Sequence, residues 1–216
     1  MTDILSLDEG YSTTRLIFND KCLMLNEDNS QFNIENSTSK KGGLRTKGYF
    51  KKSFDDKPLI SIITVVFNGE KYLEETIQSV INQTYSNVEY IIIDGGSSDG
   101  TLDIIKKYED MIDYWVSERD KGISDAFNKG IKIAKGDYIN FQGDGDGFIS
   151  SDALEKVFKG INPNEDIFVS ARIRRISPNG EELYKSKYVE NFDKKSLLFR
   201  MSMPHQGLFT HKSYFE

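Results

Sequence analysis

Cysteine is nearly absent from the sequence, because Cys22 is its single occurrence in 216 residues. A disulfide within the chain and a zinc site built from several cysteines are therefore both excluded. The start, MTDILSLDEGYS, has neither a basic segment nor a long apolar stretch, so we expect no secretion signal. The longest apolar run, residues 59–67, is interrupted by Ser61 and Thr64 and is far shorter than the roughly 20 residues of a membrane-spanning helix. These absences predict a soluble, cytoplasmic protein without a transmembrane segment.

An excess of positive charge is also missing. Lysine and arginine total 28 against 34 aspartate and glutamate residues, which gives a formal net charge of -6. Nucleic-acid backbones are bound by Lys and Arg gathered on one face. The acidic balance therefore argues against nonspecific nucleic-acid binding. A local basic patch stays open, since Arg172, Arg174 and Arg175 lie close together.

Proline is scarce, with 4 residues, whereas Phe and Tyr are numerous at 14 and 11, so most of the chain is expected to be globular. The length fits one α/β domain of ordinary size with an appendage. The composition changes near Pro58, because residues 26–57 are rich in Asn, Asp, Ser and Lys with little periodicity. We predict an N-terminal extension over 1–57, partly extended or loosely ordered, with a candidate strand at 16–25, and a main domain over 58–216.

After Pro58 the sequence alternates between short β-branched runs and amphipathic segments. The predicted strands lie at 59–67, 88–94, 112–116 and 137–141, and the predicted helices at 70–83, 99–108 and 123–134. Strands joined by helices of this length predict βαβ units, and hence an α/β fold with a mainly parallel, Rossmann-like sheet and helices on both faces. Ligands of such sheets bind outside the carboxyl ends of the strands.

Asp94 ends the second predicted strand, within the motif DGGSSDGT. The two glycines after it let the backbone approach a ligand closely, and Ser97, Ser98 or Asp99 can cap the next helix. Helix capping explains the serines and Asp99, but it does not explain an acid directly after four apolar strand residues. We therefore interpret Asp94 as a ligand-binding residue. The motif is not a dinucleotide fingerprint, because it lacks the GxGxxG spacing and follows the second strand.

The motif FQGDGDGF (141–148) directly follows the fourth predicted strand. Asp144 and Asp146 are separated and flanked by glycine at a strand end. Hard divalent cations prefer oxygen ligands and can bridge the oxygens of a diphosphate. The alternative is an ordinary acidic surface turn, since Asp and Gly are common in turns. The position after a βαβ series favours the metal site.

The stretch ERDKGISDAFNKG (118–130) precedes and begins the third predicted helix. Asp120 or Ser124 can start that helix. Lys121 and Asp125 are placed to face the ligand side of the sheet. Helix capping and surface solvation remain the alternative for this stretch.

Together these stretches resemble the inverting glycosyltransferases of family 2, which have the GT-A fold. ISIITVVFNGEKYLEETIQSVINQTYSNVEYIIIDGGSSDGT looks like the opening signature of the family, and DKGISDAFNKGIKIAKGDYINF with the acidic turn resembles its middle. MPHQGLF (203–209) looks like the Pro-His-Gln stretch of one bacterial subgroup that builds surface polysaccharides. The resemblance covers about residues 58–216 and depends on the order of several motifs.

The resemblance implies a nucleotide site at the strand ends. Val66 and Phe67 would frame the base and the ribose. Asp94 would bind the base, typically at uracil N3. Lys121 and Asp125 would line the same site.

The resemblance also implies a divalent cation, Mn or Mg. Asp146 would be its principal ligand, with Asp144 beside it and also lining the nucleotide site. His205 would approach the metal or the diphosphate, with a core or surface histidine as the alternative. His211 is assigned no functional role.

Two departures from the family pattern stand out. The subgroup usually carries Asn-x-Gly-Asp at the acidic turn, whereas residues 143–146 read Gly-Asp-Gly-Asp, so the aspartate is kept and the asparagine is lost. The general base of the family is an acidic residue expected beyond Glu216. No catalytic residue is therefore assigned, and either the chain is shortened or the protein lacks its base.

The implied reaction transfers a sugar from a nucleoside diphosphate donor, expected to be a UDP-sugar, to an acceptor hydroxyl with inversion. The acceptor would be a saccharide or lipid-linked saccharide in surface polysaccharide synthesis. A position at the inner face of the membrane and a homo-oligomer are left open. Two other interpretations remain: a noncatalytic nucleotide-binding module, favoured by the missing base, and a nucleotidyltransferase. The second would usually need a Gly-rich loop with Arg or Lys after the first strand, where the chain has FNGEKYL.

Overall fold

The computed structural model describes residues 39–164, 168–177, 179–186 and 204–215. The candidate strand at 16–25 and Cys22 lie outside them. The elements in chain order are β1 (Lys40–Gly42), η3 (Leu44–Lys47), β2 (Ile60–Val66), α1 (Leu73–Ile81), β3 (Val88–Asp94), α2 (Thr101–Lys107), η4 (Glu109–Met111), β4 (Tyr114–Ser117), α3 (Ile123–Ile133), β5 (Tyr138–Gly143), α4 (Ala153–Val157), β6 (Phe168–Ser170), β7 (Arg174–Ile176), β8 (Glu182–Lys185), η6 (His205–Gly207), β9 (Leu208–His211) and η7 (Lys212–Tyr214).

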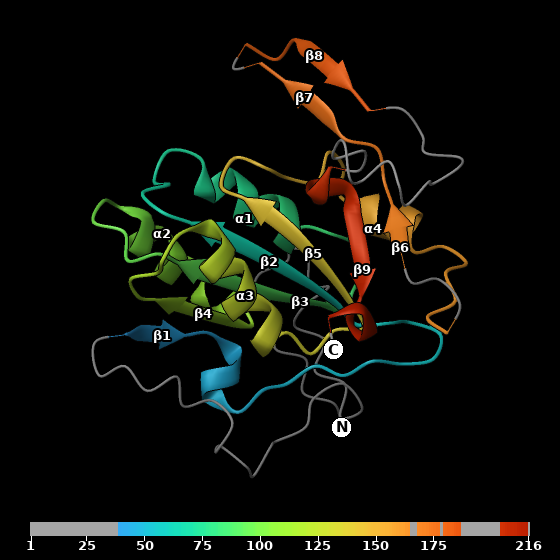
Figure 1. The fold of residues 1–216 in the computed structure, drawn as a ribbon, viewed down its shortest axis with the longest axis horizontal. Helices are drawn as coiled ribbons and strands as arrows, with labels where there is room; N and C mark the ends of the chain where they lie inside the picture. The colour runs from blue at the N-terminus through green and yellow to red at the C-terminus, as the bar shows by residue number, and fades with distance from the viewer. Residues whose placement is uncertain (1–38, 165–167, 178, 187–203, 216) are drawn as a thin grey trace, which may run out of the picture.

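The described strands form a mixed, mainly parallel sheet with the order β1-β4-β3-β2-β5-β9-β6 (Figure 1). β2 lies at its centre and pairs in parallel with β3 and β5, and β3 pairs in parallel with β4. β1, β9 and β6 join in antiparallel orientation. The carboxyl ends of β2, β3, β4 and β5 therefore meet at one edge of the sheet, where Asp94 and the acidic turn lie.

Helices cover both faces of the sheet, and each face has its own apolar cluster. Successive strand residues point to opposite faces, so Ile62 of β2 lies in one cluster and Ile63 in the other. The first cluster includes Leu73 of α1 and Ile105 of α2, and the second includes Ala126 of α3. Burial on both faces explains why β2 and β3 are near-continuous apolar runs. The predicted α/β fold with a mainly parallel sheet is confirmed.

Residues 39–57, expected to belong to a loosely ordered extension, pack on the sheet. β1 pairs with β4, with Lys40 opposite Ser117. Leu44 and Phe50 are buried. The boundary predicted at Pro58 therefore does not coincide with an edge of the fold, because part of the preceding segment supplies a strand and core side chains.

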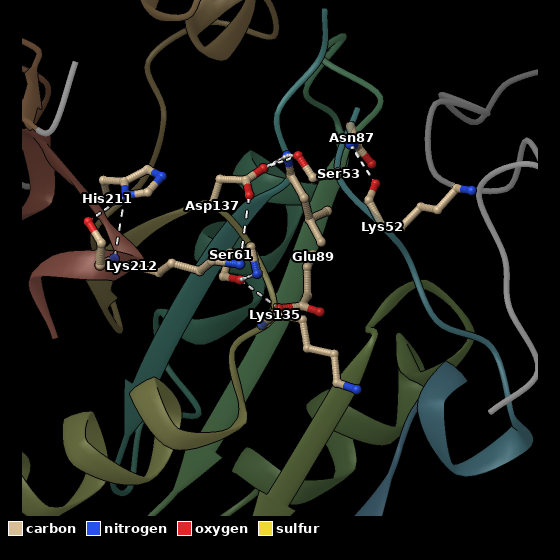
Figure 2. Close-up of polar contacts among 12 residues, drawn as sticks. Lys52, Ser53, Ser61, Asn87, Glu89, Lys135, Asp137, His211 and Lys212 are labelled. Atoms are coloured by element: carbon tan, nitrogen blue, oxygen red, sulfur yellow. Dashed lines mark hydrogen bonds and ion pairs between the residues drawn. The ribbon is translucent and has the colours of Figure 1, made fainter. Parts of the chain in front are cut away.

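A buried polar network ties this segment to the amino end of the sheet. Arg45 forms an ion pair with Glu89 of β3, and both side chains are almost completely buried. Glu89 also accepts from Ser61 Oγ at 2.6 Å and from the Lys135 N–H at 2.8 Å (Figure 2). The Arg45 guanidinium donates to the Ile133 carbonyl at 2.7 Å. Burial lowers the pKa of Arg45 to about 10, so the guanidinium remains charged at neutral pH.

β7 and β8 form a separate two-stranded ribbon whose residues are all exposed (Figure 1). Its base adjoins the turn η6, where the Ala171 N–H donates to the Gly207 carbonyl at 2.7 Å. None of the helices among the described residues has the length and apolar character needed to cross a membrane.

Candidate functional site

The loops after β2 and β3 are held together by side-chain hydrogen bonds. Asn68 has a positive φ of 53°, and its N–H donates to Ser97 Oγ at 2.7 Å. In the opposite direction, the Ser98 N–H donates to Asn68 Oδ1 at 3.0 Å. The Gly69 N–H donates to Thr101 Oγ1 at 2.9 Å. These reciprocal contacts fix the backbone at the carboxyl ends of the two central strands.

Asp94 is the buried centre of this arrangement, with 0% of its surface exposed. Its carboxylate accepts from the Ser97 N–H at 3.1 Å and from the Ser97 hydroxyl. Ser117 Oγ of β4 donates to it at 2.6 Å. Asp94 thus holds the ends of β3 and β4 and the following loop. Its predicted contact with a nucleotide base remains a prediction.

Phe67 and Asp120 lie beside Gly95, just outside these strand ends. The Phe67 ring is 63% exposed, whereas Val66 is buried in the core. A Cβ on Gly95 would lie 2.7 Å from Asp120 Oδ2 and 3.3 Å from Phe67 Cδ2. An exposed aromatic ring next to a carboxylate can receive a flat ligand ring with hydrogen-bond donors on its edge. Of Val66 and Phe67, the two residues predicted to frame a nucleotide, only Phe67, which follows β2, has an exposed side chain.

The acidic turn after β5 is anchored at several atoms. The Asp146 carboxylate accepts from the Gly143 N–H at 2.9 Å. Thr76 of α1 donates its hydroxyl to the Asp146 carbonyl at 2.7 Å and accepts from the Gly145 N–H at 2.9 Å. Gly145 has a φ of 86°, a conformation that favours glycine. The Gly-Asp-Gly-Asp sequence therefore forms a defined turn, with one carboxylate fixed by backbone donors.

The two aspartates of this turn affect each other electrostatically. Partial burial raises the pKa of the Asp144 carboxyl, and the charges of Asp146 and Asp99 raise it further. Asp144 Oδ2 lies 3.0 Å from where a Cβ on Gly69 would be, so the acidic turn approaches the loop that begins with Phe67. Neighbouring carboxylates of this kind suit a hard divalent cation, because its charge offsets their repulsion.

His205 does not complete a three-residue metal cluster in the described structure. No group of three His, Cys, Asp or Glu side chains within the described ranges could hold a metal ion. The His205 ring packs edge-on against Phe127, with 6.1 Å between centroids. Its neighbour Gln206 reaches Asp146 instead, with Nε2 3.5 Å from Oδ1. Asp144 and Asp146 therefore remain the candidate donors for a cation, and their role, like that of His205, stays a prediction.

Lys121 and Asp125 form the start of α3. The Lys121 N–H donates to Asp125 Oδ2 at 3.1 Å, and this bond is the main reason that the pKa of Asp125 is lowered. Lys129 lies 3.6 Å from the same carboxylate and 2.7 Å from Glu118. The helix start predicted at Asp120 or Ser124 is not observed, because Gly122 is the N-cap and no side chain caps the helix. The Lys121 side chain is exposed. Their nucleotide-binding roles remain predictions.

Sequence reasoning missed three polar residues that shape this site. Ser117 and Thr76 hold Asp94 and the acidic turn, and Gln206 contacts Asp146. The available signal was weak: Thr76 is a polar residue on an otherwise apolar helix face. Gln206 stood within a stretch already singled out, but the argument there concerned the histidine.

Comparison with known proteins identifies similar sequences and structures. The sequence model described as glycosyl transferase family 2 matches residues 61–213. An uncharacterized glycosyltransferase of Haemophilus influenzae is 44% identical over 102 residues, which are 46% of this chain and 40% of that protein. TuaG of Bacillus subtilis, a glycosyltransferase named for teichuronic acid biosynthesis, is 40% identical over 103 residues, also 46% and 40% of the two chains.

Among solved structures, Staphylococcus aureus TarS in complex with UDP aligns with a TM-score of 0.40 and 26% identity, over 45% of this chain and 30% of that one. The chain spans less than half the length of the curated relatives it matches.

Proposed function

The chain belongs to glycosyl transferase family 2, and on that premise we propose that it transfers a sugar from a nucleoside diphosphate to an acceptor hydroxyl with inversion. The proposed donor is a UDP-sugar, and the proposed cofactor is Mn²⁺ or Mg²⁺. The observation that carries this proposal is the proximity of an exposed aromatic ring and a pair of carboxylates, one of them anchored, at one edge of the sheet. A nucleoside diphosphate needs both surfaces, one for its base and one for its charged phosphates.

The spatial link between the two surfaces is the loop that begins with Phe67. Its Gly69 lies against Asp144, while Phe67 lies near Gly95 and Asp120. A Cβ at Gly69 would lie 2.5 Å from Val66 Cγ2 and 3.0 Å from Asp144 Oδ2, and one at Gly95 would lie 2.7 Å from Asp120 Oδ2, so glycine leaves room at both positions. The proposed base position, at Phe67, and the proposed diphosphate position, at Asp144 and Asp146, therefore belong to one continuous strip of surface.

In the proposed reaction the acceptor oxygen forms a bond to the anomeric carbon while the bond from that carbon to the diphosphate oxygen breaks. The acceptor proton passes to a base, and the diphosphate leaves with the electron pair. Asp146 and Asp144 would hold the divalent cation, which when bound offsets the negative charge of the leaving diphosphate. The Gly143 N–H and Thr76 keep the acidic turn in place before any ligand arrives.

We propose a supporting role for the buried Asp94. Its carboxylate holds Ser97, which in turn holds the Asn68 N–H beside Phe67. A direct bond from Asp94 to a base would require this carboxylate, which is 0% exposed, to become accessible. The exposed Lys121 is proposed to approach the negatively charged donor from the loop that carries Asp120.

The proposed setting is surface polysaccharide synthesis, with a saccharide or lipid-linked saccharide as acceptor. The similarity to TuaG, which is named for teichuronic acid biosynthesis, supports it. The family model itself matches residues 61–213, which contain the acidic turn and the loops described above.

Replacing Phe67 by Ala tests the base position. We expect affinity for both uridine and UDP to fall about three- to tenfold, because aromatic contacts contribute roughly 0.5–1.5 kcal/mol beyond area burial. Since the ring is 63% exposed, stability should change little. Calorimetric titration of the two ligands measures the effect.

The matched control for that experiment is Tyr184→Ala, which removes a 53% exposed aromatic ring on β8. It should leave both affinities unchanged. Equal uridine affinity in the parent and in Phe67→Ala would show that the base does not bind at Phe67. The proposal would then lose the observation that carries it.

A further inference from the structure

β5 carries two buried amides close to its carboxyl end. Asn140 is 0% exposed and Gln142 is 2% exposed. They are two positions apart, so both side chains project to the same face of the strand. The backbone of η6 and β9 lies within hydrogen-bond distance of these amides. An apolar pair would be the ordinary choice at such depth, and two amides therefore call for an explanation.

The amides hold the turn η6 by its carbonyl groups. Asn140 Nδ2 donates to the Gln206 carbonyl at 3.0 Å and to the Leu208 carbonyl at 2.9 Å. Gln142 Nε2 donates to Asn140 Oδ1 at 2.7 Å and to the Gln206 carbonyl at 3.0 Å. All of these partners are acceptors, so both amide groups must face them with nitrogen.

This orientation leaves the Gln142 Oε1 atom buried and without a hydrogen-bond partner among the residues that the structure describes. An unpaired buried oxygen is destabilising, and a methionine of similar length would avoid it. The benefit of glutamine at this position must therefore come from its two donated hydrogen bonds. Both of them fix the position of Gln206, one directly and one through Asn140.

The side chain of Gln206 leads from this turn to the acidic turn. Gln206 Nε2 lies 3.5 Å from Asp146 Oδ1, while the Gly143 N–H lies 2.9 Å from Asp146 Oδ2. Each oxygen of the Asp146 carboxylate thus has its own donor. Metal-ligating carboxylates are commonly oriented by such outer partners, which tune metal affinity without touching the metal.

We propose that Gln206 is a positioning residue for Asp146, and that Asn140 and Gln142 set its place by holding the backbone of η6. The proposal rests on the proposed function, in which Asp146 binds the divalent cation. Because Gln206 is neutral, it orients the carboxylate without competing with the cation for its charge. This assigns the glutamine of the Pro-His-Gln stretch a role that does not involve the neighbouring histidine.

The test measures Mn²⁺ affinity in the presence of saturating UDP, by the electron paramagnetic resonance signal of free Mn²⁺. Gln206→Met keeps the length of the side chain but removes its donor. We expect about a tenfold loss of Mn²⁺ affinity, since outer-partner substitutions typically cost roughly 10–100-fold. Uridine affinity should stay unchanged, because uridine has no diphosphate. The matched control is Gln78→Met. The Gln78 amide, on α1, donates to the hydroxyl of Tyr108 at the end of α2.

Gln142→Met is a second variant that tests the same positioning role. It should weaken Mn²⁺ binding in the same direction, and the double variant with Gln206→Met should be no weaker than Gln206→Met alone, because both act through one contact. Unchanged Mn²⁺ affinity in Gln206→Met, or additive losses in the double variant, would overturn the positioning role. A parent protein that binds no Mn²⁺ with UDP would instead contradict the proposed function, so the two failures are distinguishable.

Discussion

Asp146→Asn is expected to lower the affinity for Mn²⁺ about a hundredfold when UDP is present. Asparagine has the same shape and retains an oxygen for the Gly143 N–H, which Asp146 accepts at 2.9 Å, so the turn should survive. The negative charge is lost, and with it the strongest attraction for a hard cation. Substituting a residue that orients a metal ligand without touching the metal already lowers metal affinity roughly 10–100-fold.

Two further variants serve as comparisons for that experiment. Asp144→Asn should cost less, because Asp146 is the proposed principal ligand of the cation and Asp144 lies beside it. Asp103→Asn, on the exposed side of α2, removes the same charge away from the acidic turn and should have no effect. If Asp146→Asn and Asp103→Asn bind Mn²⁺ equally well, the acidic turn is an ordinary surface turn that does not bind the cation.

Arg45→Met is expected to destabilise the fold by about 3–5 kcal/mol. The substitution leaves the buried Glu89 without its cation, and breaking a buried ion pair on one side typically costs this much. Glu89 would keep Ser61 and the Lys135 N–H as partners, but neither neutralises its charge. Urea denaturation measures the change in the free energy of unfolding.

The matched control for Arg45 is Arg174→Met, which breaks the exposed pair between Arg174 and Glu182 at 3.1 Å. Exposed pairs contribute roughly 0–1 kcal/mol, so this variant should stay close to the parent. Adding Glu89→Gln to Arg45→Met should recover part of the loss, because no buried charge remains unpaired. Equal stability of the Arg45→Met and Arg174→Met variants would show that the segment before Pro58 adds little to the domain.

The central part of the fold was predictable because its strands are buried on both faces. The runs at 59–67 and 88–94 correspond to β2 and β3, and the polar motifs after them lie at the predicted edge of the sheet. The acidic turn could be located for the same reason, since Asp144 directly follows β5 and Asp146 lies two positions later. Local pattern and sheet geometry were sufficient there.

The long-range contacts of the fold and of the site were not predictable from local pattern. Arg45 meets Glu89 across 44 sequence positions, and β1 is only three residues long with no alternation to mark it. Glu89 and Asn140 interrupt apolar strands, which signals a buried partner without naming it. Gln206 reaches Asp146 through a turn positioned by long-range contacts, so its role depends on the assembled structure.

The central claim is a cation-dependent diphosphate site beside a base site, and its most direct measurement is calorimetric titration of UDP into the parent protein with Mn²⁺ and with chelator. We predict at least tenfold tighter UDP binding with Mn²⁺, while uridine should bind equally in both conditions because it has no phosphates for the cation to bridge. Equal affinity for UDP with Mn²⁺ and with chelator would contradict the account.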